Sequence, residues 1–230
     1  TPSGPLHLGN LRTALLSWLQ VRLKRGQWLL RIDDLDPPRV RPGATDSALE
    51  DLRWLGLHWD GDVIFQSQRL GIYSSFLSAM RREGLLYACR CTRKQLAGID
   101  IYPGTCRQRA LGWGIEGGRL PSWRLMVPDS FASSCGDPVV RRADGFVAYH
   151  LATVVDELTL GITDVVRGDD LVSACSAHQA VAAVLGQPSP AYHHVPLLLT
   201  DGGLKLSKHE IVILANGMNN FVRQCIGDER

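Results

Sequence analysis

Thr1-Pro-Ser-Gly-Pro-Leu-His-Leu-Gly-Asn10 is the stretch around which the rest of the chain is organised. Its prolines and glycines exclude regular structure, and apolar residues recur at helical spacing from Asn10 onward. The stretch therefore predicts a loop that delivers His7, Gly9 and Asn10 to a helix N-terminus. Free N–H groups and a partial positive charge at such an end suit a phosphate, and Gly9 would let a ligand approach the backbone. An ordinary loop with an asparagine cap fits the same residues.

The residues downstream alternate between strand and helix patterns. We expect helices at 10–25, 44–55, 69–82 and 169–185, and strands at 28–32, 63–65, 162–167 and 195–199. This alternation predicts an α/β fold with a Rossmann-like, doubly wound parallel sheet. Ligands bind beyond the carboxyl ends of such strands, and Asp33, Arg167 and residues 205–208 all follow predicted strands.

The alternation stops near residue 87. Residues 87–141 hold a cysteine cluster, many glycines and prolines and short β-like pieces, so we interpret them as an inserted subdomain. We therefore expect residues 1–86 and 142–208 to be the two halves of one α/β domain. Residues 209–230 form a separate tail in this division.

The composition is that of an ordinary globular protein, with 45% hydrophobic and 21% charged residues in a chain of 230. The formal net charge of +2 gives no evidence by itself for a nucleic-acid partner. No apolar run approaches the ~20 residues of a membrane span, so we expect no membrane partner. The six cysteines do not form a disulfide framework, which favours a reducing cytoplasm.

Three cysteines lie close together in the predicted insertion. Cys89 and Cys91 are separated by one residue, and Cys106 follows fifteen positions after Cys91. Zinc takes four N, S or O ligands in a tetrahedron, and three thiolates supply most of that set. Water, Asp100 and Tyr102 are all possible fourth ligands, and three free cysteines in a loop are the alternative.

A lysine-rich stretch, Gly203-Leu-Lys-Leu-Ser-Lys208, follows the last predicted strand. A solvated basic turn would explain it alone. Taken with residues 7–10, it resembles the paired HIGH and KMSKS signatures of class I aminoacyl-tRNA synthetases. The resemblance implies that His7, Asn10, Lys205 and Lys208 are catalytic, and that His7, Gly9, Asn10 and Lys208 bind ATP, which would be accompanied by Mg²⁺.

The stretch Arg31-Ile-Asp-Asp-Leu-Asp-Pro-Pro-Arg39 resembles the RIEDxD element of glutamyl-type synthetases. There the residue at the position of Asp33 is usually glutamate and holds the substrate α-amino group. The resemblance implies that Tyr149 and Arg167 hold the side-chain carboxylate of L-glutamate, and arginine suits a bidentate grip on a carboxylate. Thr1 and Ser3 are expected to complete the glutamate site, whereas Asp34 and Asp36 are expected to serve turn and capping roles.

The spacing Cys-x-Cys followed by Tyr-x₃-Cys is the pattern of the glutamyl-Q tRNA(Asp) synthetases. The resemblance implies one structural zinc per chain held by Cys89, Cys91, Tyr102 and Cys106. It also implies ATP-dependent formation of glutamyl-adenylate and transfer of the glutamyl group to queuosine in the anticodon of tRNA(Asp), by a monomer.

Two alternatives stay open beside this family. A fragment of a glutamyl-tRNA synthetase, which charges tRNA(Glu), shares every glutamate and ATP motif. A non-catalytic, zinc-bearing RNA-binding module would explain the cysteines without the lysines. The family also has a first strand upstream of position 1 that ends in an arginine, so we expect this chain to lack that strand, and its tail 209–230 to diverge from the family.

Overall fold

A computed structural model describes residues 1–198 of the chain. Lys205 and Lys208 of the predicted lysine loop, and the tail 209–230, lie outside the described residues. The α-helices within residues 1–198 are α1 (Leu8–Leu23), α2 (Ala44–Trp54), α3 (Leu70–Arg82), α4 (Asp129–Cys135), α5 (Tyr149–Thr159) and α6 (Cys175–Val184). Short 3₁₀ helices are η1 (Pro37–Arg39), η2 (Gln66–Arg69) and η3 (Asp169–Ala174).

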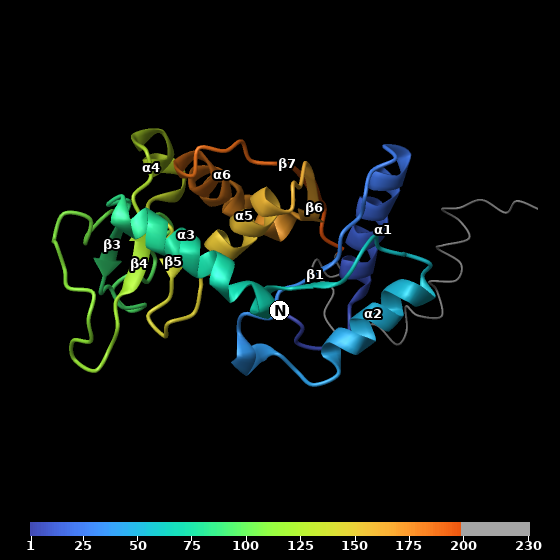
Figure 1. The fold of residues 1–230 in the computed structure, drawn as a ribbon, viewed down its shortest axis with the longest axis horizontal. Helices are drawn as coiled ribbons and strands as arrows, with labels where there is room; N and C mark the ends of the chain where they lie inside the picture. The colour runs from blue at the N-terminus through green and yellow to red at the C-terminus, as the bar shows by residue number, and fades with distance from the viewer. Residues whose placement is uncertain (199–230) are drawn as a thin grey trace, which may run out of the picture.

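The strands form three small sheets. They are β1 (Arg31–Ile32), β2 (Ile64–Phe65), β3 (Leu86–Cys89), β4 (Ser122–Leu125), β5 (Val139–Arg141), β6 (Asp164–Gly168) and β7 (Ala191–Val195). The pairs β1–β2 and β6–β7 are parallel, and β3–β4–β5 is antiparallel. Figure 1 shows the antiparallel sheet at the end of the molecule opposite α1 and α2.

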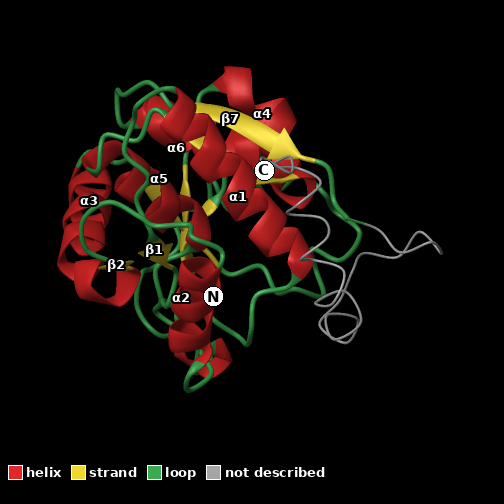
Figure 2. Ribbon diagram, turned by 90° about the vertical axis from the view of Figure 1, so that its right-hand side faces the viewer, coloured by secondary structure: helices red, strands yellow, loops and turns green. Residues whose placement is uncertain are grey.

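The predicted α/β class with parallel pairing is confirmed. One continuous doubly wound sheet is not observed, because no strand within residues 1–198 hydrogen-bonds to both parallel pairs. Figures 1 and 2 show α1 beside the β6–β7 pair, and Arg12 of α1 donates a 2.8 Å hydrogen bond to the carbonyl oxygen of Pro196. The expected strand upstream of position 1, the division into domain segments and the divergence of the tail stay predictions.

The strand predicted at 195–199 is wrong, because the last described strand is β7, Ala191–Val195. Pro196 follows it, and a proline has no N–H to continue a ladder. β7 pairs in register with β6, Asp164 opposite Ala191 and Gly168 opposite Val195. The apolar run misled the prediction because β7 alternates exposed and partly buried residues and buries only Val195.

Two helices also differ from the pattern-based expectation. The helix predicted at 169–185 is divided into η3 and α6 at Cys175. Helix α5 was not predicted, and it is buried at seven consecutive residues, Leu151–Glu157, which include the polar Thr153, Asp156 and Glu157. The predicted helices at 10–25, 44–55 and 69–82 are confirmed to within about two residues at each end.

The main core joins α3, α5 and α6 to the antiparallel sheet. Its fully buried side chains include Tyr73 of α3, Leu125 of β4, Val140 of β5, Leu151 of α5 and Val181 of α6. Each fully buried large apolar side chain contributes about 1.5–3 kcal/mol relative to an exposed one. The antiparallel sheet therefore packs into the same core as α3, α5 and α6.

A second core lies under the N-terminal helices. Trp28, Leu52 and Leu57 are buried there against one face of α1. The opposite face leaves Leu16, Leu19 and Leu23 partly or largely exposed. No helix in the described part of the chain is both long and apolar enough to cross a membrane.

Candidate functional site

The N-terminus of α1 is built by His7, Gly9 and Asn10. The backbone N–H of Asn10 donates to His7 Nδ1 at 3.2 Å, and the backbone N–H of His7 donates to Asn10 Oδ1 at 3.3 Å, which makes a reciprocal capping box. A side chain at Gly9 would meet the His7 ring at 3.1 Å, so glycine leaves room for this ring. Local sequence therefore holds the predicted HIGH-like residues in one arrangement.

Two neighbouring cavities share His7 and Asn10. The first, of about 280 Å³, is also lined by Gly9 and by Arg167 at the end of β6. The second, of about 490 Å³, is also lined by Thr1, Ser3, Arg31 and Asp33. His7 and Asn10, predicted for ATP, therefore line both cavities, whereas the residues predicted for the glutamate amino group line only the second.

Asp33 is held by Arg31. Its carboxylate accepts hydrogen bonds from Arg31 Nε at 2.6 Å and from Arg31 Nη2 at 3.1 Å. Asp34 accepts from the backbone N–H and hydroxyl of Ser67 at 2.8 and 2.6 Å. The two carboxylates therefore point to different partners, with Asp33 at the cavity and Asp34 bonded to η2.

Asp36 lies between two arginines. Hydrogen bonds from Arg142 and Arg39 lower the pKa of its carboxyl group. These contacts hold the turn after β1 in place. Asp36 thus has the structural role expected from its place in a turn.

Arg31 also contacts a buried carboxylate in the protein interior. Asp156 of α5 is fully buried, and its oxygen lies 3.3 Å from Arg31 Nη1. Arg69, Gln66 and Tyr73 donate further hydrogen bonds to Asp156, at 2.7, 2.9 and 2.9 Å. Arg31 therefore connects the interior of the protein to Asp33 at the cavity.

Arg167 is buried, with 7% of its surface exposed. Nε donates to His194 Nε2 at 3.3 Å, Nη1 lies 3.1 Å from His178 Nδ1, and Nη2 donates to Cys175 Sγ at 2.9 Å. The guanidinium carbon also lies 4.4 Å from the ring centre of Tyr192. No Asp or Glu within residues 1–198 forms an ion pair with Arg167.

Tyr149 lies next to this arginine centre at the start of α5. Its ring centre is 5.3 Å from that of His178, and 42% of its surface is exposed. Burial of its ring raises the pKa of Tyr149, so the hydroxyl stays protonated and can donate to an anion. Tyr149 and Arg167 thus both contact the buried His178.

Glu157 is connected to this centre through Tyr192. Tyr192 donates a 2.8 Å hydrogen bond to Glu157 Oε2, and the Tyr192 ring separates this carboxylate from Arg167. Burial raises the pKa of Glu157, although the hydrogen bond from Tyr192 and the charge of Arg31 oppose that shift. Arg167 forms no ion pair with Glu157, although its charge also acts to lower the pKa of that carboxyl group.

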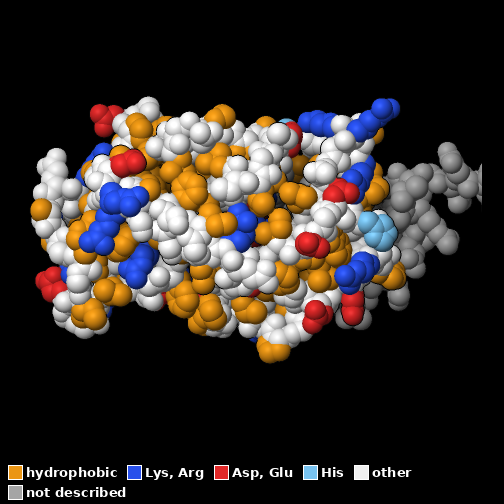
Figure 3. Space-filling model, in the orientation of Figure 1, with side chains coloured by type: hydrophobic (Ala, Val, Ile, Leu, Met, Phe, Trp, Pro, Cys, Tyr) orange, Lys and Arg blue, Asp and Glu red, His pale blue; other side chains and the backbone are white. Residues whose placement is uncertain are grey.

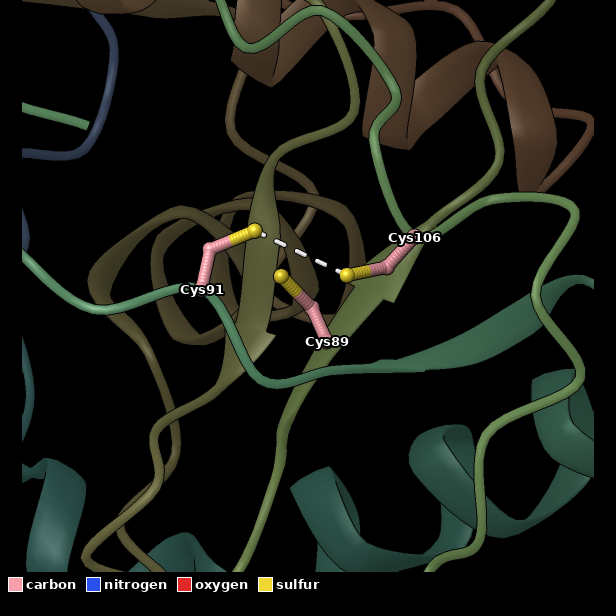
Figure 4. A group of neighbouring side chains, drawn as sticks. All are labelled: Cys89, Cys91 and Cys106. Atoms are coloured by element: carbon pink, nitrogen blue, oxygen red, sulfur yellow. Dashed lines mark hydrogen bonds between the residues drawn. The ribbon is translucent and has the colours of Figure 1, made fainter. Parts of the chain in front are cut away.

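Cys89, Cys91 and Cys106 form one compact cluster, drawn in Figure 4. Their sulfur atoms all lie within 4.8 Å of one another, and the Cys91 and Cys106 sulfurs are 3.6 Å apart. A zinc tetrahedron with Zn–S bonds of ~2.3 Å separates its sulfurs by about 3.8 Å. The three thiols therefore fit a zinc ion without a large rearrangement.

The Tyr102 hydroxyl lies against the same cluster. Its oxygen is 3.4 Å from Cys89 Sγ and 3.8 Å from Cys91 Sγ. Gly136 makes this position possible, because a side chain there would meet the Tyr102 carbonyl oxygen at 2.6 Å. Of the three possible fourth ligands, Tyr102 is thus the protein group that the fold brings to the thiols.

The Cys89 thiol has an altered acidity. Burial alone would raise its pKa, but hydrogen bonds from Tyr102 and the Cys91 backbone, together with Arg124, lower it to about 7. A thiolate is the form that binds a metal ion. Burial instead raises the pKa of the neighbouring Cys91 thiol to about 11, so the compatibility with zinc rests on the positions of the donors.

Basic side chains gather over α3 and the antiparallel sheet (Figure 3). Arg81 lies over the rings of Trp113 and Trp123, with its guanidinium carbon 4.4 and 5.2 Å from their centres. Arg141 lies 4.8 Å from the Trp123 ring centre. The near-neutral chain thus carries a locally basic, aromatic surface.

The surroundings of Arg167 could not be anticipated. Cys175, His178 and His194 contact Arg167 but belong to none of the motifs in the sequence. These residues come from η3/α6 and β7, up to 27 positions from Arg167, and only the β6–β7 pairing brings them to it. No local pattern marks such a set.

Comparisons with known proteins agree on the kind of catalytic domain. The model of the family "tRNA synthetases class I (E and Q), catalytic domain" matches residues 1–100 and 129–221. The unmatched residues 101–128 include Tyr102 and Cys106.

Curated relatives cover most of the chain. A glutamyl-Q tRNA(Asp) synthetase of Prochlorococcus marinus (strain MIT 9313) is 60% identical over 217 residues, which cover 91% of this chain and 71% of the relative. One from Chromobacterium violaceum is 44% identical over 92% of this chain and 77% of the relative.

A solved structure shows the same architecture. The glutamate tRNA ligase of Elizabethkingia meningosepticum, in complex with its amino acid, superposes with a TM-score of 0.76 at 25% identity. The superposition covers 90% of this chain and spans only half the length of that ligase.

Proposed function

Because the chain belongs to the glutamyl-Q tRNA(Asp) synthetase family of class I aminoacyl-tRNA synthetase catalytic domains, we propose that it activates L-glutamate with ATP and glutamylates queuosine in tRNA(Asp). The observation that carries the proposal is Arg167, a buried cation without an acidic ion-pair partner within residues 1–198, at a cavity shared with His7 and Asn10. A carboxylate substrate supplies the missing negative charge.

The first step joins glutamate to AMP. An oxygen of the α-carboxylate of glutamate attacks the α-phosphorus of ATP. The bond from this phosphorus to the oxygen that bridges to the β-phosphate breaks, and pyrophosphate leaves. His7, Gly9 and Asn10 would position the nucleotide at the N-terminus of α1, and Mg²⁺ would accompany ATP. Lys205 and Lys208 would neutralise charge on the phosphates, with Lys208 at the α-phosphate. Catalysis rests on positioning and on charge stabilisation.

The second step releases AMP. A hydroxyl of the queuosine diol attacks the glutamyl carbonyl carbon, its proton is lost, and AMP departs with the bonding electrons. An anticodon loop can present its bases outward to a pocket, and the basic, aromatic surface over α3 and the antiparallel sheet suits an RNA.

The glutamate site would use both ends of the substrate. Asp33, with Thr1 and Ser3 in the same cavity, would hold the α-amino group. Arg167 and Tyr149 would hold the side-chain carboxylate. Since a bidentate guanidinium offers no acceptor to an amide NH₂, this pair would select glutamate over glutamine.

We propose one structural zinc bound by Cys89, Cys91, Cys106 and Tyr102. When bound, the ion would cross-link the long segment between β3 and β4, and metal binding would be coupled to folding of that segment. Elemental analysis of protein purified without added metal should give one zinc per chain. A metal-free protein in which this segment is folded would contradict the assignment.

The acceptor is tested by comparing tRNA(Asp) with and without queuosine, using the full-length protein and radiolabelled glutamate. We expect ATP–pyrophosphate exchange without tRNA, and labelling only of the queuosine-containing tRNA. Labelling of tRNA(Glu) at its 3′ end instead would assign the protein to the ordinary glutamyl-tRNA synthetases. The solved glutamate tRNA ligase is an enzyme of that kind. A protein that binds RNA but catalyses no ATP–pyrophosphate exchange would instead favour the non-catalytic module.

The family and its substrates lead us to propose a cytoplasmic monomer. Light scattering of the purified protein with and without tRNA measures the oligomeric state directly.

A further inference from the structure

The guanidinium of Arg167 has five N–H donors, and three of them are already engaged. One N–H on each of Nε, Nη1 and Nη2 is taken by His194, His178 and Cys175. Counting partners within residues 1–198, this leaves one N–H on Nη1 and one on Nη2. Two N–H groups on the two terminal nitrogens are what an end-on bidentate carboxylate requires.

His178 is the most constrained of the three acceptors. It is fully buried, whereas Cys175 is only partly buried. Its ring faces Arg167 from β6, Tyr149 and His150 from α5, and Tyr192 from β7. Within the described residues its Nε2 atom has no hydrogen-bond partner, so Nδ1 makes its only polar contact.

The contact with Arg167 defines the state of the ring. Arg167 can only donate, so Nδ1 must be the unprotonated nitrogen and Nε2 must carry the hydrogen. Burial lowers the pKa of His178 to about 3, and the nearby charges of His150 and Arg167 act in the same direction. The ring is therefore a neutral acceptor under physiological conditions.

From this geometry we infer that His178 is a positioning residue that orients Arg167 for glutamate and thereby helps to reject glutamine. The inference rests on the proposed function. By holding one N–H of Nη1, His178 sets the rotation of the guanidinium plane, so that the two remaining N–H groups point together toward one carboxylate. Its contact with the Tyr149 ring places the second proposed carboxylate ligand on the same support.

Two substitutions separate positioning from packing. In His178→Asn, the side-chain oxygen can occupy the place of Nδ1 and accept from Arg167, but part of the ring volume is lost. In His178→Leu, more of the volume is filled but no acceptor remains. A packing role predicts that Leu is the milder change, whereas a positioning role predicts that Asn is the milder change for substrate recognition.

The readout is ATP–pyrophosphate exchange by the full-length protein with glutamate and with glutamine. For His178→Leu we expect KM for glutamate to rise roughly tenfold or more, the effect of losing a hydrogen bond to a charged group. KM for ATP should change little, and the preference for glutamate over glutamine should fall. His178→Asn should stay within about threefold of the wild type, since it keeps the acceptor.

The inference would be overturned if the two variants raised the KM for glutamate equally. It would also be overturned if the KM for ATP and kcat were impaired as strongly as the KM for glutamate. A second measurement does not depend on activity or on the folding of a variant. ¹⁵N NMR of the histidine rings in the wild type should show His178 with a hydrogen on Nε2 and no titration between pH 5 and 8.

A hydrogen on Nδ1, or titration in that range, would overturn the inference even if the enzyme is active. Conversely, the expected tautomer in a protein without exchange activity would leave the Arg167–His178 contact established, while the proposed function would fail. Thermal unfolding of both variants reports separately on packing.

Discussion

Two of the buried charged centres in the described part of the chain are built differently. Asp156 is fully buried, and four donors surround it, among them the cations Arg31 and Arg69. Arg167 is almost as buried, but its three polar contacts are two imidazoles and a thiol. Within residues 1–198, the first centre has oppositely charged partners and the second has none.

The difference indicates what each centre is for. Burial of a charge costs several kcal/mol unless opposite charge and hydrogen bonds offset it. The Asp156 centre meets that requirement and ties α5 to β1, η2 and α3. The Arg167 centre meets it only in part, which is expected where a ligand completes the site. The predictions below test this contrast, from the largest expected effect to the smallest.

Asp156→Asn should produce the largest loss of stability. The substitution leaves Arg31 and Arg69 without their shared counter-charge, and breaking a buried pair costs about 3–5 kcal/mol. Urea unfolding measures the change in the free energy of unfolding. Asp46→Asn, at an exposed position in the first turn of α2, is the matched control, with an expected effect below about 1 kcal/mol. Equal effects at the two positions would show that the charge of Asp156 does not stabilise the fold.

Arg167→Ala and Arg69→Ala should have opposite consequences. Arg167→Ala should weaken glutamate binding by about 2–4 kcal/mol, because the substrate carboxylate would lose its partner. Its effect on the free energy of unfolding should be small, since it removes a buried charge that the chain compensates only in part. Arg69→Ala should instead destabilise the protein and leave the KM for glutamate nearly unchanged. Calorimetric glutamate titration and urea unfolding of both variants decide this, and a destabilised Arg167→Ala protein would contradict it.

Arg31→Met should reduce both the stability of the protein and its binding of glutamate, each by an intermediate amount. Arg31 contacts Asp156 on one side and Asp33 on the other. Removing its charge should cost roughly 1–3 kcal/mol of stability and also raise the KM for glutamate, because Asp33 loses the group that orients it. Asp33→Asn is the comparison, with a similar rise in KM but a smaller loss of stability. A change in stability alone in Arg31→Met would separate Asp33 from amino-group binding.

Acid should destabilise the protein partly through His178. The unfolded chain takes up a proton near the ordinary pKa of 6.5, whereas the folded pKa is about 3 because of burial and the nearby charges of His150 and Arg167. Unfolding therefore binds a proton between these values, so the stability from the neutral ring is present above pH 6.5 and falls as pH decreases toward 3. The slope from one such group is at most about 1.4 kcal/mol per pH unit.

His178→Asn cannot titrate, so its free energy of unfolding should fall less steeply between pH 6.5 and 4.5. Urea unfolding at several pH values measures the slope, and His58→Asn, at an exposed histidine, is the control. Identical slopes in the wild type and in His178→Asn would show that the His178 ring is protonated in the folded protein.

Local sequence was sufficient for features that depend on neighbouring residues. The helices near α1, α2 and α3 followed from apolar spacing and from their terminal glycines, because these signals act within a few residues. The three thiols could also be grouped from sequence, since Cys89, Cys91 and Cys106 lie within eighteen positions and a zinc site needs several ligands at short distances. Asp33 and Arg167 were recognised as site candidates because they lie at or directly after the end of a predicted strand and in stretches that resemble the family.

Only the tertiary structure decided the rest. β7 ends at Val195 because its partner β6 sets the register and Pro196 cannot extend the ladder, although the apolar run continues. The position of Tyr102 depends on Gly136, more than thirty residues away, whose missing side chain admits its backbone. The contrast between Asp156 and Arg167 is likewise invisible in the sequence. Whether a buried charge is balanced depends on which distant side chains the packing brings within hydrogen-bonding distance.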